Sequence, residues 1–276
     1  MIPRLIPVSL GSGGLSKLEG QFDGLVVLFA SLDQLIAKPT ESLSALSHIV
    51  KDHSKLNVGL SALGGLIVTE KVPGSRLLLS PLGSLKGDTD DVRRYGEAAR
   101  SALSKCVSIG IKKPLFVLQD EGATSATRSQ KDYSKKLQVA LLGLLAEAYV
   151  PLQAREHLIA TTGSCSLKIS EIGFVSEETQ SYDWVNAVEQ GRFLARDIGG
   201  SDPERMSPLK CAQHLAAAFK DSSNIRVTVL TDPNLIKQEY PLMHAVARCS
   251  LDVSRHYPAV VRLEYHAPDP SAVKEK

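Results

Sequence analysis

Short apolar runs alternate along this chain with longer segments of helical periodicity, and this alternation restricts the folds open to it. The apolar runs are rich in Val, Ile and Leu, and they predict strands at residues 5–10, 24–30, 66–70, 76–80, 114–119 and 169–175. Apolar residues at three- and four-residue steps predict helices at residues 41–52, 89–108, 131–149, 181–198 and 208–220. Strands that alternate with helices are typical of α/β proteins, so we predict this fold class, with a mixed or largely parallel sheet.

The segment 89–108 illustrates the helical pattern. Asp88, Asp90 and Asp91 are expected in its first turn, where the helix dipole favours anions. One face carries the apolar set Tyr95, Ala98, Ala99, Ala102, Leu103 and Cys106. We predict a surface helix that packs on the sheet.

Residues 181–200 divide the chain into two parts. Gly199-Gly200 supplies a carboxyl-terminal stop for this helix. Its predicted apolar stripe consists of Trp184, Val185, Val188, Leu194 and Ile198. We therefore predict an amino-terminal α/β domain at 1–180, a linking helix at 181–200 and a second domain at 201–276.

The second domain begins with a capped helix. Ser207 is the predicted N-cap and Pro208 the first helical residue. An alternating strand at 225–229, a short helix after Asp232-Pro233 and a strand at 259–265 follow. About 70 residues are few for an α/β sheet covered on both faces, so we expect the truncated start of a larger domain.

Several motifs within the last third of the chain carry a family resemblance. They are Ala195-Arg196-Asp197-Ile198, Asp202-Pro203, Ser207-Pro208, the segment AVARCS at 245–250 and the segment PAVVRLEY at 258–265. Their order and spacing resemble the cytosol (leucyl) aminopeptidase family, and the resemblance extends from Tyr182 to His266.

The same segment departs from the family pattern at several positions. Both asparagines of the family's turn are missing between Gly199 and Pro208, and two family glycines are replaced by side-chain-bearing residues at 246–250. One proline of a family pair is replaced by Tyr257. Because glycine tolerates backbone angles that other residues avoid, these replacements indicate a divergent branch with altered loops.

The resemblance implies a metalloexopeptidase that removes amino-terminal residues from peptides. Family members use two divalent metals, zinc or manganese, to polarise the scissile carbonyl and to activate a bridging water. Their metal and substrate ligands lie beyond the point that corresponds to Lys276. For this chain we therefore expect no catalytic, metal-binding or substrate-binding residue, no cofactor and no activity alone. The two metals and a peptide substrate are expected only in a full-length member, and the family's hexamer is a weaker expectation here.

No other constellation in the sequence replaces that site. Ser164-Cys165-Ser166 lacks a recognisable base and orienting acid, which favours a loop. Gly11-Ser12-Gly13-Gly14 could expose amides to an anion or be a flexible connection, and it matches no phosphate-binding fingerprint. The seven histidines form no HExxH pair and are interpreted as surface or satisfied polar residues: His48, His53, His157, His214, His244, His256 and His266.

Composition excludes two classes of partner. Lys and Arg total 32 against 30 acidic residues, so a nucleic-acid partner is not expected, and Lys112-Lys113 and Lys135-Lys136 are interpreted as small basic pairs on solvent faces. The longest apolar runs, 25–30 and 139–146, are shorter than the roughly 20 residues of a membrane span, and no secretory signal is visible. We predict a soluble, cytoplasmic protein without membrane association. Its four well-separated cysteines predict reduced, buried thiols: Cys106, Cys165, Cys211 and Cys249.

Two functional hypotheses follow. In the first, the chain is the amino-terminal part, a short isoform or an incomplete product of a leucyl-aminopeptidase-like enzyme. In the second, it is a non-catalytic interaction module or short isoform that binds a partner subunit through an uncovered sheet surface.

Overall fold

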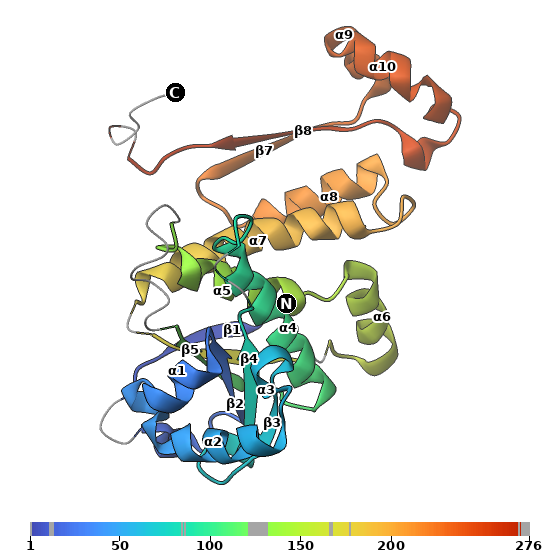
Figure 1. Ribbon diagram of the computed structural model, residues 1–276. Coiled ribbons are helices and arrows are strands. Elements are labelled where there is room, and N and C mark those ends of the chain that lie inside the picture. Colours follow the sequence, from blue (N-terminus) through green and yellow to red (C-terminus); the bar gives the residue numbers. More distant parts are fainter. Residues whose placement is uncertain are drawn as a thin grey trace. The chain divides into compact units, whose positions relative to one another are not determined.

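The computed structural model describes residues 2–10, 14–83, 85, 87–120, 132–165, 168–176, 178–269 and 271. The chain forms two compact units (Figure 1). Unit 1 contains residues 1–150 and 154–194, and unit 2 contains residues 151–153 and 195–276.

Unit 1 is built on a six-stranded sheet with the strand order β1-β6-β5-β2-β4-β3. All neighbouring strands are parallel except β3, which runs antiparallel to β4 (Figure 1). The predicted α/β fold with a mixed sheet is therefore confirmed. The strands are β1 Arg4–Val8, β2 Gly24–Phe29, β3 Gly65–Val68, β4 Arg76–Pro81, β5 Pro114–Gln119 and β6 Glu171–Val175.

The burial of the central strand β2 explains why its sequence is an unbroken apolar run. All six of its residues are buried. Val26 and Leu28 belong to one hydrophobic cluster, whereas Leu25, Val27 and Phe29 belong to another. Because successive side chains of a strand point to opposite faces, both faces of the sheet are covered by a core.

Helices cover both faces of the sheet. One cluster is completed by α4 and α5, and the other by α1, η2, α2 and α3. The helical elements of this part of the chain are η1 Gly14–Leu18, α1 Leu32–Ala37, η2 Glu41–Leu46, α2 Ser47–Leu56, α3 Leu60–Leu63, η3 Pro73–Ser75, α4 Arg93–Ser108, α5 Lys136–Glu147, α6 Leu152–Thr162 and α7 Gln180–Gly200.

Two predicted helices begin later than expected. Helix α4 starts at Arg93, because Asp90 and Asp91 instead accept hydrogen bonds from the backbone N–H groups of Gly87 and Arg93, at 2.7 and 2.8 Å. Such local side-chain bonds compete with helix formation. Helix α5 starts at Lys136, whereas the predicted helix was 131–149. Residue 131 and the preceding segment 121–130 lie outside the described residues.

Helix α6 was not predicted. Only Leu152 is buried among its residues, so its sequence lacks the one-sided apolar pattern on which the prediction depends. The stripe predicted for α7 is only partly correct, since Val185 is fully buried but Trp184 is 55% exposed. The boundary between the two units falls inside α7, between residues 194 and 195.

Unit 2 contains the elements that the sequence predicts after residue 200. They are α8 Pro208–Phe219, β7 Ile225–Leu230, α9 Pro233–Glu239, α10 Pro241–Ala247, η4 Arg248–Ser250, η5 Ser254–His256 and β8 Val260–Tyr265. Strands β7 and β8 form an antiparallel two-stranded sheet (Figure 1). Pro208 begins α8 as expected, although the Ser207 side chain makes no capping hydrogen bond.

Within the described part of the chain, no single helix combines the length and the apolar composition needed to cross a bilayer. Taken together, helices α5 and α6 have the necessary length and apolar composition, but the pair is bent by 50°. That observation carries little weight, because α5 contributes many of its apolar side chains to the core of unit 1.

Candidate functional site

The carboxyl ends of β2 and β5 are the natural place to look for a ligand site in unit 1. The chain leaves β2 toward β3 and β4 on one side of the sheet, and it leaves β5 toward β6 on the other. In open α/β sheets, ligands bind outside the carboxyl ends of the strands at such a switch point. The polar groups that follow these two strands are therefore the first candidates for ligand-binding residues.

Asp120, immediately after β5, is a deeply buried ion-pair partner at this edge. Asp120 is 6% exposed, and its carboxylate accepts a 2.8 Å hydrogen bond from the Tyr95 hydroxyl. The Lys136 ammonium donates to both carboxylate oxygens, at 3.0 and 2.9 Å. These donors satisfy a charge that would be expensive to bury alone, and they tie β5 to α4 and α5. The arrangement is a structural brace, because no oxygen of Asp120 is left as a free base.

Gln119 performs a similar task one residue earlier. It is 2% exposed. Its side-chain oxygen accepts from the backbone N–H of Thr40 at 2.8 Å, and its amide donates to the carbonyl of Lys38 at 3.1 Å. The side chain therefore holds the connection between α1 and η2 against the end of β5.

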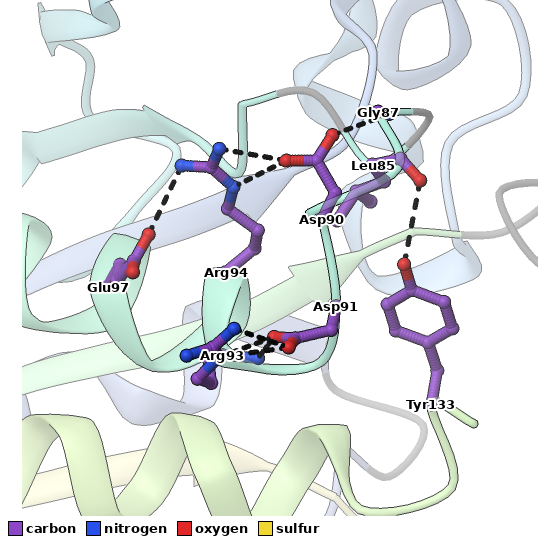
Figure 2. Close-up of polar contacts among 8 residues, drawn as sticks. All are labelled: Leu85, Gly87, Asp90, Asp91, Arg93, Arg94, Glu97 and Tyr133. Carbon is purple, nitrogen blue, oxygen red and sulfur yellow. Dashed lines mark hydrogen bonds and ion pairs between the residues drawn. The ribbon is translucent and has the colours of Figure 1, made fainter. Parts of the chain in front are cut away.

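A third cluster lies between β4 and α4 (Figure 2). The Asp90 carboxylate is 4% exposed and accepts from the Arg94 guanidinium at 3.0 and 2.8 Å. The same guanidinium donates to Glu97 at 3.2 Å, and Tyr133 donates to the carbonyl of Leu85 at 3.5 Å (Figure 2). The bonds of Arg94 to Asp90 and Glu97 are local and shape the entry to α4, whereas the bond from Tyr133 spans 48 positions of the chain.

Unit 2 has its own polar contacts in the segment that carries the family motifs. The Glu204 carboxylate contacts Arg255 and, at 2.7 Å, His256. The pKa of Glu204 is lowered, mainly by the hydrogen bond to His256 and then by that to Arg255. Asp202 accepts from the backbone N–H groups of Glu204 and Arg205 at 2.9 and 3.0 Å. These contacts join the turn after α7 to η5.

Two carboxylates on α7 are buried, which the sequence analysis did not predict. Glu189 and Asp197 are only 1% and 3% exposed. Asp197 lies 3.7 Å from the Nε2 atom of His214 on α8, which places an ion pair between the two helices when His214 is protonated. The spacing of eight residues between the two carboxylates fits one helix face, but only the tertiary structure shows that this face is covered.

The described residues contain no group of three or more His, Cys, Asp or Glu side chains that could hold a metal ion. The prediction that the histidines lie at the surface or are satisfied polar residues fits six of the seven, whereas the Nε2 atom of His214 is buried and makes no hydrogen bond within the described residues. His48, His53, His157 and His266 are exposed, and His214, His244 and His256 are partly exposed.

Two predictions about other residues need correction. Lys136 is not on a solvent face, because it pairs with the buried Asp120. Cys249 is exposed, and Cys165 and Cys211 are partly exposed, so only Cys106 fits the prediction of buried thiols. None of the four cysteines is paired.

The remaining candidates are placed as follows. Ser164 and Cys165 lie in the predicted loop after α6, and Ser166 lies outside the described residues. Gly14 begins η1, whereas Gly11, Ser12 and Gly13 also lie outside the described residues.

We expect thiol reagents to distinguish Cys249 from Cys106. Burial raises the pKa of the Cys106 thiol to about 12, so almost none of it is thiolate at neutral pH. Labelling of the native protein with a maleimide should modify Cys249 first and Cys106 at least about a thousandfold more slowly. Mass spectrometry of digested protein measures both rates, and Cys249→Ser is the control that removes the fast site. Rapid modification of Cys106 in the folded protein would contradict this assignment.

Comparison with known proteins agrees with the motifs of unit 2. Residues 193–275 match the family model of the cytosol aminopeptidase family, catalytic domain. A Caenorhabditis elegans protein named as an aminopeptidase is 31% identical over 257 residues, which is 91% of this chain and 46% of that protein. The resemblance predicted from the sequence is confirmed.

Solved structures share the fold. A tomato leucine aminopeptidase variant aligns with a TM-score of 0.66 and 15% identity, covering 97% of this chain and 51% of the tomato chain. The bottromycin maturation enzyme BotP, solved with manganese, aligns with a TM-score of 0.61 and 14% identity, covering 90% of this chain and 46% of its own. This chain spans about half the length of these proteins.

Proposed function

The chain is a relative of the cytosol aminopeptidases, and from this premise we propose that it supplies the amino-terminal unit and the entrance to the catalytic domain of an enzyme that removes amino-terminal residues from peptides. The observation that carries the proposal is the match of residues 193–275 to the family's catalytic domain. In this proposal residues 181–200 link the two domains. The peptide substrate and any homo-oligomer are properties of the whole enzyme.

We further propose that the residues of this chain do not hold the catalytic metals. The family's chemistry needs several ligands converging on two divalent ions. Among the buried carboxylates of the described ranges, Asp120 is bound by Lys136 and Tyr95, and Asp90 by Arg94 and Gly87. Glu189 and Asp197 lie 3.6 and 3.7 Å from Arg192 and His214. In this proposal the two metals are bound by other residues of a full-length enzyme.

Metal binding and turnover test this proposal directly. We expect the purified 276-residue chain to bind neither zinc nor manganese stoichiometrically by calorimetry, and to leave leucine p-nitroanilide uncleaved. Circular dichroism on the same sample establishes that it is folded. Tight stoichiometric binding together with turnover would overturn the proposal and would require a metal site within the chain.

A specific feature of unit 2 favours a second candidate function, that of a non-catalytic module that binds a partner subunit. One face of the β7–β8 sheet is apolar throughout, because its three cross-strand pairs are Ile225 with Tyr265, Val227 with Leu263, and Val229 with Val261. Val229, Leu263 and Tyr265 are 41%, 46% and 68% exposed. Helix α8 packs against both strands, and Ile225, Val227 and Val261 are partly buried. An apolar face that remains this exposed is typical of association surfaces.

If this face mediates association, Leu263→Lys should reduce it. The lysine places a charge in the middle of the apolar face, so we expect a clear fall in the weight-average mass measured by sedimentation at high protein concentration. Glu264→Gln is the matched control, since it also raises the net charge by one but lies on the opposite face of β8. Equal association of the two variants would eliminate this face as the contact surface.

A further inference from the structure

Unit 1 contains a hollow whose presence is not explained by the buried polar contacts of Asp120, Gln119 and Asp90 or by the aminopeptidase relationship. Its volume is about 380 Å³, and it lies among α4, α5 and the Arg192 region of α7. The residues that line it are Arg93, Gly96, Glu97, Arg100, Val139, Leu142, Gly143, Ala146 and Arg192. All of them belong to unit 1. The volume is within the range of about 300–1,000 Å³ found for small-molecule sites.

The floor of the hollow is an apolar stripe on α5. Val139, Leu142 and Ala146 follow one another at steps of three and four residues, so they share one helix face, and each is partly exposed. The core of unit 1 is contacted by the other face of α5, through Leu137, Ala140, Leu141, Leu144 and Leu145. Leu142 also packs against this core, so core packing accounts fully for one apolar side of α5 and only in part for the other.

Two glycines fix the shape of this floor. A Cβ atom at Gly143 would lie 2.5 Å from the backbone oxygen of Gly96, and one at Gly96 would lie 3.1 Å from the backbone oxygen of Val139. Helices α4 and α5 are thus in backbone contact at the base of the hollow. A side chain at Gly143 would force the two backbones apart, and one at Gly96 would require a smaller shift.

Arg100 and Arg192 place positive charge at the rim of the hollow, and each forms only a long ion pair. Their ion pairs, with Glu147 and Glu189, have nitrogen–oxygen distances of 3.9 and 3.6 Å. These distances exceed those of a hydrogen bond, and the two side chains are 56% and 44% exposed. A guanidinium carries five N–H donors, so each arginine can still bind an incoming carboxylate in the bidentate manner.

The other charges of the lining do not cancel this preference. The Arg93 guanidinium is occupied by Asp91, with Nε at 3.0 and 2.9 Å from the two carboxylate oxygens (Figure 2). Glu97 is the acidic residue of the lining, and it is held at 3.2 Å by Arg94, which lies outside the lining (Figure 2). The hollow thus combines an apolar floor with a rim that favours anions.

We propose that this hollow binds a small amphipathic carboxylate. The apolar body of the ligand lies on the stripe formed by Val139, Leu142 and Ala146, and its carboxylate binds the rim arginines Arg100 and Arg192. The shape and the few convergent charged groups are those of a ligand pocket. The proposal depends only on the residues that line the hollow and not on the proposed function.

Octanoate is a suitable probe, and 1-octanol is its neutral counterpart of equal chain length. We expect calorimetry on the full chain to show one octanoate bound per chain, with 1-octanol bound at least about fivefold more weakly, since 1-octanol lacks the carboxylate that pairs with the two partly exposed arginines. Raising the salt concentration should weaken octanoate binding and leave 1-octanol unchanged. Equal binding of the two probes, or no binding of octanoate at millimolar concentration, would overturn the proposal.

Four variants locate the site. Arg100→Gln and Arg192→Gln should each weaken octanoate binding about fivefold, and Ala146→Phe, which fills the floor without changing charge, should abolish it. Lys51→Gln removes a positive charge from the exposed surface of α2 and should have no effect. Circular dichroism identifies any variant that fails to fold. If the three variants in the hollow bind octanoate like the wild type, the hollow is not the site.

Discussion

Replacement of Lys136 by Met is expected to lower the free energy of unfolding by about 2–4 kcal/mol. The variant keeps the length of the side chain but leaves the carboxylate of Asp120 without its cation. That carboxylate is 7% exposed, whereas Lys136 is 31% exposed. Breaking a fully buried pair costs about 3–5 kcal/mol, and the partial exposure of Lys136 reduces this figure. Urea denaturation followed by circular dichroism measures the change.

A double-mutant cycle separates the ion pair from other effects of the substitution. In Asp120→Asn combined with Lys136→Met, the new amide oxygen can still accept the hydrogen bond that Tyr95 now donates to Asp120. We expect this double variant to recover more than half of the stability lost in Lys136→Met, because no unpaired charge remains. A loss that is the same in both variants would assign the effect to packing.

The strands of unit 1 were predictable from the sequence because each is a short, nearly continuous apolar run. The run at β2 is buried on both faces, so every position had to be apolar, and flanking polar residues mark its ends. Helix boundaries were less predictable. Asp90 and Asp91 look like first-turn residues of a helix, but their side chains bond to Gly87 and Arg93 before the helix begins. The same residue types favour both arrangements.

The polar braces could not be predicted in the same way. Asp120 and Lys136 are separated by sixteen positions, and the Tyr95 hydroxyl comes from a helix 25 residues earlier. No local periodicity relates them, and a lysine beside Lys135 resembles a solvent-exposed basic pair. The family motifs of unit 2 were recognisable because they keep order and spacing along the chain, which a sequence can show without any knowledge of contacts.

Replacement of Gly143 by Ala should destabilise the protein, although the same change in a helix is ordinarily stabilising. Glycine inside a helix costs about 0.5–1 kcal/mol relative to alanine, so an unobstructed substitution would raise the free energy of unfolding. At Gly143 the new methyl group would lie 2.5 Å from the Gly96 oxygen and 2.8 Å from its Cα atom. Backbone cannot rotate away, so α4 and α5 must separate. We expect a net loss of about 1–3 kcal/mol in urea denaturation.

Gly191 on α7 provides the matched control for this prediction. It is also a helical glycine, but a Cβ atom built there meets nothing within 4 Å. Gly191→Ala should therefore stabilise the protein by about 0.5–1 kcal/mol, opposite in sign to Gly143→Ala. Gly96→Ala, whose Cβ would be 3.1 Å from the Val139 oxygen, should fall between the two. If Gly143→Ala instead stabilised the protein as much as Gly191→Ala, the backbone contact between α4 and α5 would be wrong, and with it the floor assigned to the hollow.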